Sequence, residues 1–322
     1  MTPETVPPRT AVIGAGMAGL TCAAALRAAG GSVTVFDKAR GPGGRMSTRR
    51  LTLPDREVTF DHGAPVFTAR DPGFRAQVAL WTQAGLVAPW SAAGEGAFVG
   101  APAMNAPLKA VAAGLEIRCG VTITGLARIG DGWVLEGPDE LDLAYDRVVL
   151  AVPAEQAAVL LAAVNDPFAA LARSTVSAPC WSLMLVFSRP IETELRVLDG
   201  DEVIGRAFRD GHKPGRSGGE AWVIQASSTW SRDNLEAGPS DVATWLLAAF
   251  ETRMPTPLPP LLSSVAHRWR YAQPEPLALG ALWDPAAGLG VCGDWLDGGD
   301  VEGAWRSGAR LAAQLNAADA RP

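Results

Sequence analysis

The stretch TAVIGAGMAGLTCAAALRAAGGSVTVFD, residues 10–37, decides the fold. Its apolar start at 10–13 predicts a short buried strand, the alanine-rich segment 17–29 predicts a helix, and the β-branched run 33–36 predicts a second strand. The turn after the first strand fits the pattern G-x-G-x-x-G, and Asp37 closes the second strand, 18 residues after the last glycine of the turn. A strand, a glycine turn, a helix and an acidic strand end in this order predict a dinucleotide-binding unit.

Each part of this turn has a physical role in such a unit. Gly14 permits the tight turn, Gly16 lets the backbone approach a pyrophosphate, and Gly19 lets the helix pack close to the strand. The helix N-terminus then faces the phosphates with free N–H groups, and Asp37 accepts hydrogen bonds from a ribose. A second match at residues 288–293 lies within a predicted strand and has no helix directly after it, so we reject it.

The segment KARGPGGRM, residues 38–46, indicates which dinucleotide is bound. With the aspartate before it, it resembles the acidic-residue, short-spacer, Gly-Gly-Arg pattern of the FAD-dependent amine oxidase and desaturase superfamily. The glycine pair lets the loop lie against the cofactor, and Arg45 can bond the pyrophosphate as a fork. We therefore expect FAD. Covalent attachment is not expected, because Cys292 falls inside a strand and no cysteine follows it.

The C-terminal part points to the same cofactor. Residues 293–304 read as a strand end, a glycine turn and a helix start. The resemblance to the superfamily implies that Asp294 bonds the ribityl chain and that the helix opening at Val301 points at the N1/C2=O edge of the flavin, where negative charge accumulates on reduction. Val121 matches the valine that contacts adenine in these folds, although a plain core valine is an equal alternative.

The order of elements predicts an α/β protein, namely a glutathione-reductase-like, Rossmann-like FAD-binding domain with an inserted α+β substrate domain. The FAD-binding domain is expected at 1–65, 100–160 and 281–322, and the substrate domain at 66–99 and 161–280. Further helices are predicted at 76–84, 104–113, 241–254 and 301–315, a strand meander at 116–119, 121–128 and 133–136, and other strands at 147–152, 183–187, 221–226, 266–271 and 289–292.

Further motifs narrow the resemblance to the renalase family, in its bacterial branch. They are Phe60-Asp61-His62-Gly63-Ala64, Phe67-Thr68-Ala69-Arg70, Lys213-Pro214-Gly215-Arg216, Gln225-Ala226-Ser227 and His267-Arg268-Trp269-Arg270-Tyr271. This resemblance implies oxidation of dihydropyridine isomers of NAD(P)H that carry hydride at the 2 or 6 position, with hydride transfer to flavin N5 and reduction of O2 to H2O2. At Pro65 and Val66 the chain departs from the family, which usually has glutamine and tyrosine there; this puts the substrate in more doubt than the cofactor.

The site residues follow from these motifs. His267, Trp269 and Tyr271 alternate along one strand face, and we expect this face to line the flavin cavity with His267 and Tyr271 orienting the nicotinamide. The alternative is that Trp269 and Tyr271 are core residues and that His267 is a strand histidine with its hydrogen bonds satisfied. The expected cofactor-binding residues are Gly14, Gly16, Met17, Ala18, Gly19, Asp37, Lys38, Arg45, Met46, Gly63, Ala64, Val121, Asp294, Val301 and Glu302.

Other functions stay open at this point. A flavin amine oxidase commonly has an aromatic cage, often with two tyrosines, and a lysine near flavin N5, whereas this chain has just two tyrosines, and its lysines do not fall on an expected N5-facing strand. A cage of tryptophans from Trp181, Trp283 or Trp295 is an alternative, as is a protein that binds FAD without catalysis. A carotenoid-type desaturase would need a long apolar docking segment, which the chain lacks.

Composition limits the partners. A net charge of −6 and a pI near 5.2 argue against nucleic acid. The four cysteines and three histidines are scattered, so no metal site is predicted. No apolar run approaches the length of a membrane span, and the first ten residues do not resemble a signal peptide, so we expect a cytoplasmic protein that meets no membrane. The oligomeric state is left open.

Overall fold

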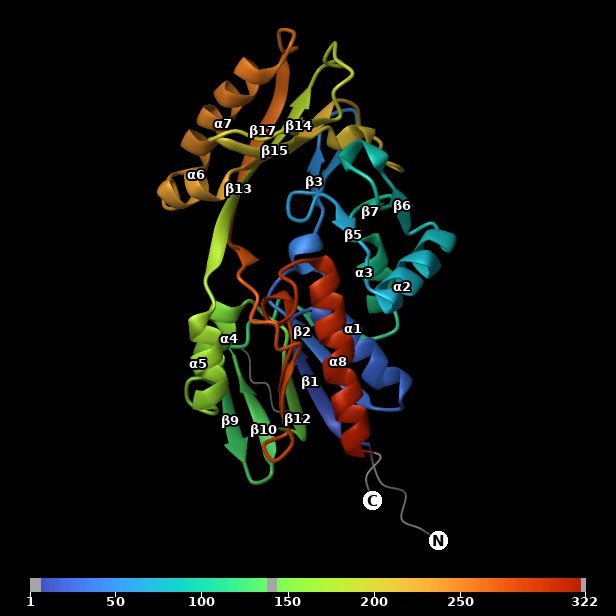
Figure 1. Ribbon diagram of the computed structural model, residues 1–322, viewed down its shortest axis with the longest axis vertical. Coiled ribbons are helices and arrows are strands. Elements are labelled where there is room, and N and C mark those ends of the chain that lie inside the picture. The colour runs from blue at the N-terminus through green and yellow to red at the C-terminus, as the bar shows by residue number, and fades with distance from the viewer. Residues whose placement is uncertain (1–6, 138–143, 320–322) are drawn as a thin grey trace. The chain divides into compact units, whose positions relative to one another are not determined.

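The computed structural model describes residues 7–137 and 144–319 (Figure 1). Two compact units are present: unit 1 comprises 1–44, 108–176 and 274–322, and unit 2 comprises 45–107 and 177–273. Residues 45–65 and 100–107, expected with the FAD-binding domain, lie in unit 2, whereas residues 161–176 and 274–280, expected with the substrate domain, lie in unit 1. Each unit is built from segments that are distant in the sequence, as the order of predicted elements suggested.

Unit 1 contains a sheet of six strands in the order β18-β19-β12-β1-β2-β8. Its strands are β1 (Arg9–Ile13), β2 (Ser32–Asp37), β8 (Glu116–Cys119), β12 (Arg147–Leu150), β18 (Leu282–Asp284) and β19 (Leu289–Val291). All neighbours run parallel except β18, which is antiparallel to β19. The apolar runs predicted these strands well, because parallel strands are covered on both faces and need continuous apolar sequence.

One predicted element of this region was wrong in its pairing. The strand at 116–119 was expected in a meander, but β8 pairs in parallel with β2 at the edge of the main sheet. The meander instead consists of β9 (Gly125–Ile129), β10 (Gly132–Glu136) and the two-residue β11 (Ala144–Tyr145). The turn signal at 130–132 correctly marks the hairpin between β9 and β10, but nothing local in the sequence shows that β8 joins a strand some eighty residues away.

The helices of unit 1 pack against its main sheet. They are α1 (Met17–Ala28), α4 (Ala154–Leu161), α5 (Asp166–Ser174) and α8 (Val301–Asp319); α4 and α5 were not predicted. Figure 1 shows α1 and α8 running side by side along the sheet. A buried cluster joins the sheet to β9, β10, α4 and α5, with Trp133 and Trp295 at most 1% exposed. The helix α3 (Ala106–Ala112) spans the boundary of the two units.

Unit 2 is built on a sheet of five strands in the order β14-β15-β16-β13-β17. These are β13 (Ser177–Phe187), β14 (Val197–Asp199), β15 (Ile204–Phe208), β16 (Ala221–Ala226) and β17 (Leu261–Pro274). The helices α6 (Ser228–Asp233) and α7 (Pro239–Arg253) lie along this sheet (Figure 1), and α7 packs its buried face against β13, β15 and β16. The hairpin of β3 (Arg49–Thr52) and β4 (Glu57–Phe60) contributes to a second apolar cluster with β13 and β16.

A smaller sheet completes unit 2. It has the order β5-β7-β6, from β5 (Phe67–Thr68), β6 (Val87–Pro89) and β7 (Ala97–Gly100), beside the helix α2 (Pro72–Gln83). Asp71 caps α2 by accepting the N–H of Phe74 at 3.0 Å, which explains why the helix begins before the predicted residue. Within the described ranges, no helix combines the length and the apolar character that a membrane crossing requires.

Candidate functional site

The glycine turn of unit 1 lies at the point in the sheet where the strand order reverses. From β1 the chain continues to β2 on one side, while β12 flanks β1 on the other, and ligands of such sheets bind at this switch point. Gly14 has φ of +115°, and a Cβ there would lie 2.3 Å from the carbonyl oxygen of Ala151. A Cβ at Gly19 would lie 2.0 Å from the Gly14 oxygen. Both positions therefore require glycine for the turn and for the close approach of α1.

The N-terminus of α1 carries no capping side chain. Gly16 occupies the N-cap, the first helical turn holds no acidic residue, and the first intrahelical bond runs from Leu20 N–H to the Gly16 oxygen at 3.0 Å. A Cβ at Gly16 would find its nearest neighbour only at 4.0 Å, the Cα of Gly44. The N–H groups of Met17 and Ala18 thus begin a helix whose positive end is left without a side-chain anion. This arrangement fits a phosphate.

Asp37 lies beside this turn. Its two carboxylate oxygens accept the N–H groups of Ala15 at 2.6 Å and of Ala39 at 2.7 Å, and its carbonyl accepts the N–H of Val121 at 3.0 Å. Each carboxylate oxygen has further lone pairs for a ribose hydroxyl. The structure thus brings Val121 next to Asp37, as an adenine contact would need, while the side chain of Lys38 is exposed.

The C-terminal motif forms the short helical turn η4 (Asp294–Leu296) and the start of α8. Asp294 is 4% exposed, and its carbonyl accepts the N–H of Gly299 at 2.9 Å. Asp300 caps α8, because its Oδ1 accepts the N–H of Gly303 at 2.7 Å. Glu302, in the first turn of α8, is buried at 5% exposure. The predicted residues Asp294, Val301 and Glu302 therefore lie within one continuous segment, from η4 to the first turn of α8.

Small residues bring the two helix starts together. A Cβ at Gly308 would lie 2.2 Å from the carbonyl oxygen of Ala18, so α8 crosses α1 in direct backbone contact. Ser307 accepts the N–H of Gly293 at 2.9 Å and ties α8 to the end of β19. Val301 lies two turns before Gly308, about 10 Å along the helix axis. An extended cofactor can therefore meet both helix starts of unit 1. The sequence analysis overlooked Ser307 and Gly308.

In unit 2 the segment 45–64 folds back on itself beside β17. The carbonyl of Arg45 accepts the N–H of Ala64 at 2.7 Å, and its guanidinium donates to the carbonyl of Ala272 at 3.0 Å. A Cβ at Gly63 would lie 1.9 Å from the Arg45 oxygen and 3.2 Å from the ring of Trp269. Gly63 is therefore required for this packing. Met46, which follows Arg45 in this segment, is buried.

Three aromatic rings gather where the segment after β4 meets β17. The ring centroids of His62 and His267 lie 4.9 Å apart, those of His267 and Trp269 4.6 Å apart, and those of His62 and Trp269 5.1 Å apart. The indole N–H of Trp269 donates to the His62 carbonyl at 2.7 Å. We call His62, His267 and Trp269 the ring cluster. His267 and Trp269 are half-buried, and so is Tyr271 on the same strand face; none of the three is a core residue.

The other face of β17 confirms the predicted alternation. Arg268 donates to Glu236 at 2.9 Å, and Arg270 forms an ion pair with the same carboxylate at 2.8 Å. Sequence reasoning placed His62 in a motif but gave it no role. The contact that reveals its role comes from β17, about two hundred residues later, and no local pattern could have shown it.

Both imidazoles of the ring cluster are neutral at pH 7. Burial lowers the pKa of His62 to about 4, and repulsion from His267 when that ring is protonated, and from Arg49, adds to this. Burial and the charge of Arg49 also lower the pKa of His267. The ring cluster therefore offers flat, uncharged surfaces with hydrogen-bonding nitrogen atoms.

A buried ion network holds the residue before His62 in place. Asp61 accepts hydrogen bonds from Lys213 at 3.1 Å and from Arg216, and Lys213 also pairs with Asp210. Although burial alone would raise the pKa of Asp61, the charges of Lys213 and Arg216 hold it below its usual value. The Lys213–Arg216 motif therefore anchors the loop that carries His62 and Gly63. Gln225 helps by donating to the Gly63 carbonyl at 2.6 Å.

Of the three tryptophans considered for an aromatic amine cage, two are core side chains and the third, Trp283, is half-buried. Trp181 is 1% exposed and donates its indole N–H to the carbonyl of Asn234 at 3.0 Å, and Trp295 is fully buried and donates to Val152 at 3.2 Å. Tyr145 is 4% exposed, in edge contact with Phe36. These are core side chains.

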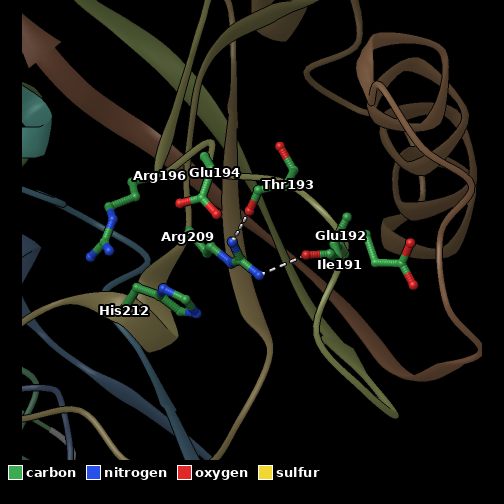
Figure 2. Close-up of a pocket in the computed structure, with 7 residues that line it drawn as sticks. All are labelled: Ile191, Glu192, Thr193, Glu194, Arg196, Arg209 and His212. Atoms are coloured by element: carbon green, nitrogen blue, oxygen red, sulfur yellow. Dashed lines mark hydrogen bonds between the residues drawn. The ribbon is translucent and has the colours of Figure 1, made fainter.

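A polar hollow of about 610 Å³ also lies in unit 2 (Figure 2). Its lining consists of Ile191, Glu192, Thr193, Glu194, Arg196, Arg209 and His212, and none of these was predicted as a site residue. Arg209 pairs with Glu220 at 2.8 Å. It also donates to the carbonyls of Thr193 at 2.7 Å and Ile191 at 3.0 Å, the two bonds that are dashed in Figure 2. Its guanidinium is therefore engaged in holding the loop. Among the described residues, no group of three His, Cys, Asp or Glu side chains could hold a metal ion.

Comparisons with known proteins agree with this geometry. Residues 12–81 match the NAD(P)-binding Rossmann-like domain, and residues 82–316 match the flavin containing amine oxidoreductase family. Among solved structures, the chain is similar to cyclohexylamine oxidase from Brevibacterium oxydans IH-35A, at 13% identity and a TM-score of 0.72, covering 98% of this chain and 100% of that chain. It is similar to putrescine oxidase bound to putrescine, at 14% identity and a TM-score of 0.64, with coverage of 98% and 100%. A proposed protoporphyrinogen oxidase from Exiguobacterium sp. 255-15 has 11% identity and a TM-score of 0.69, with coverage of 98% and 100%. These likenesses show the fold.

Proposed function

Because the chain belongs to the flavin containing amine oxidoreductase family and is an FAD-dependent oxidoreductase, we propose that it oxidises the 2- and 6-dihydro isomers of NAD(P)H to NAD(P)⁺. In this reaction the dihydropyridine ring would give up a hydride and become an aromatic pyridinium, and O2 would take up the two electrons, with the hydrogen of the hydride and one proton from water, as H2O2. The proposal places the enzyme close to the renalases within its family.

The ring cluster is the observation that carries this proposal. A dihydropyridine that gives up hydride needs no base, because the product is aromatic once the hydride has left. Burial and neighbouring positive charges keep His62 and His267 neutral, and the described residues around them offer ring surfaces and nitrogen lone pairs. Such groups can position a flat heterocycle and exclude water, and positioning is the main demand of hydride transfer.

The chain's own residues have the following roles in the proposal. The N–H groups at the start of α1 hold the pyrophosphate of FAD, Asp37 holds the adenosine ribose, and Arg45 adds a guanidinium to the phosphates. Asp294 and the opening of α8 hold the ribityl chain and the pyrimidine edge of the flavin. FAD supplies the two-electron chemistry when bound. His267, Trp269 and Tyr271 orient the substrate ring. Gly63 and Ala64 let the loop beside them pack against the Arg45 carbonyl.

Oxidation of a small amine is the second candidate. It is favoured by the family and by the likeness to cyclohexylamine and putrescine oxidases. Three observations weigh against it. Of the three tryptophans considered for a cage, Trp181 and Trp295 are core residues, and Trp283 alone is half-buried. Tyr145 is buried. Lys213 is bound to two carboxylates, so it is not a lysine that could serve flavin N5.

Anaerobic reduction distinguishes the two candidates. The purified holoprotein is mixed in separate samples with the 2-, 4- and 6-dihydro isomers of NADH and with a panel of primary amines, and the visible flavin band is followed. We expect rapid bleaching by the 2- and 6-dihydro isomers and none by the amines, and admission of air should then release peroxide. Bleaching by an amine alone would replace the proposal with the amine oxidase function.

A further inference from the structure

Arg49 is an exposed arginine beside the ring cluster. It begins β3, and its register partner on β4 is Phe60, two residues before His62. Its guanidinium has no carboxylate or carbonyl partner among the residues that the structure describes. Its neighbours are engaged: Arg50 pairs with Glu57 at 3.8 Å, and Arg56 pairs with Asp55 at 2.6 Å and donates to the carbonyl of Gly218 at 3.0 Å.

The charges around Arg49 are not balanced by an acid. His62 and His267 are neutral, since burial and the charge of Arg49 lower the pKa of each of these imidazoles. The carboxylate next to His62 in the sequence, Asp61, is fully buried and already pairs with Lys213 and Arg216. The region of the ring cluster therefore carries a net positive charge on a side chain that solvent can reach.

We propose that Arg49 binds a phosphate group of the dihydronicotinamide nucleotide and so selects the nucleotide over a free dihydronicotinamide ring. The inference rests on the proposed function and adds a specificity residue to it: a free ring would meet the ring cluster, whereas a nucleotide would meet the ring cluster and Arg49 together. A guanidinium matches phosphate oxygens with two parallel N–H groups. The same unbalanced positive charge disfavours a protonated amine.

The size of the effect follows from the strength of a charge-assisted hydrogen bond. Losing one such bond weakens binding about 10- to 150-fold at low ionic strength. Because Arg49 is exposed, added salt should reduce the effect. Its removal should leave the fold intact, since the substitution keeps the backbone pairing with Phe60 and the Arg49 side chain has no hydrogen bond to another described residue.

The experiment measures ligand binding to the oxidised holoenzyme through the change in flavin absorbance. The two ligands are NAD⁺ and N-methylnicotinamide, which share the pyridinium ring and differ in the phosphates. The variants are Arg49→Gln and, as a matched control on the same strand, Arg50→Gln, whose arginine already pairs with Glu57. Thermal unfolding and flavin content are recorded for both, and anaerobic bleaching by the 6-dihydro isomer of NADH is measured with the unmodified enzyme.

We expect Arg49→Gln to weaken NAD⁺ binding at least tenfold, to leave N-methylnicotinamide binding unchanged, and to reduce the salt dependence of NAD⁺ binding. Arg50→Gln should stay within twofold for both ligands. Equal NAD⁺ binding by Arg49→Gln and the unmodified enzyme, or an equal loss of both ligands, overturns the inference. If the 6-dihydro isomer bleaches the flavin, such a result overturns the role of Arg49 alone; if the isomer does not bleach it, the proposed function fails with it.

Discussion

Replacement of Gly16 by alanine separates cofactor binding from folding. Apart from its chain neighbours and its own helix, the Cβ would have no described atom closer than the Gly44 Cα at 4.0 Å. The backbone at this residue has φ of −86° and ψ of −173°, which alanine adopts freely. The methyl group would therefore project only into the space in which the helix N-terminus approaches a phosphate. We expect Gly16→Ala to weaken FAD binding and to leave the apoprotein nearly as stable as before.

The magnitudes can be worked out from the same contacts. Loss of one or two charge-assisted N–H bonds to the pyrophosphate costs about 1.5–3 kcal/mol each, so the Kd for FAD should rise about tenfold or more. For the apoprotein, a weaker N-cap and a less flexible unfolded chain act in opposite directions, and the net change should stay within about 1 kcal/mol. Gly19→Ala differs, because its Cβ would meet the Gly14 oxygen at 2.0 Å and Ala151 Cβ at 3.0 Å. It should destabilise the apoprotein by about 1–3 kcal/mol.

Denaturant unfolding of the apoproteins and FAD titration followed by flavin fluorescence measure the two effects separately. Gly114→Ala serves as a control, since its Cβ would lie in ordinary contact, 3.9 Å from the Val111 oxygen. The reasoning is refuted if Gly16→Ala binds FAD as tightly as the unmodified chain, or if it destabilises the apoprotein as much as Gly19→Ala does.

Three further predictions concern the rest of the molecule. Burial lowers the pKa of His62 from 6.5 to about 4, so on acidification the unfolded chain takes up a proton on this imidazole before the folded chain does. About 3 kcal/mol of unfolding free energy should therefore be lost as the pH falls from about 6.5 to 4. Urea unfolding across this range should show the loss, and a flat profile would contradict it. Asp61→Asn removes the carboxylate that Lys213 and Arg216 share, and it leaves the buried Arg216 without its ion-pair partner while Lys213 keeps Asp210. It should cost about 3–5 kcal/mol in the same assay, whereas a change below 1 kcal/mol would contradict the role of Asp61 in this network. Cys119 is the one exposed cysteine of the four, so a thiol reagent should modify one cysteine in the native protein and all four after unfolding; faster reaction of a second thiol would contradict the burial of the others.

The cofactor unit could be predicted closely from the sequence because its signals are local. The strand, turn and helix of residues 9–28 depend on an apolar run and on glycines whose spacing has a steric reason, and the structure confirms both. The pairing of β8 with β2 could not be predicted, since a short strand shows the same alternation in a meander and at a sheet edge. The crossing of α1 and α8 at Gly308 depends on two helices nearly three hundred residues apart.

The substrate region was less predictable because it depends on distant contacts. The alternation of His267 and Trp269 along β17 was predicted and confirmed. The position of His62 was not, because it depends on Trp269 and on an Asp61 carboxylate that meets Lys213 across 152 residues of sequence. The predicted FAD and substrate contacts themselves remain predictions, and the variants described above test them.

Flavin content is the most direct measurement of the central claim that the turn at Gly14–Gly19 and the start of α8 hold FAD. The recombinant protein is purified, its flavin-to-protein ratio is taken from the absorbance spectrum, and the chain is then precipitated with acid. We predict one FAD per chain, released intact into the supernatant. A colourless protein that takes up no added FAD, while its unfolding transition shows that it is folded, would contradict the account.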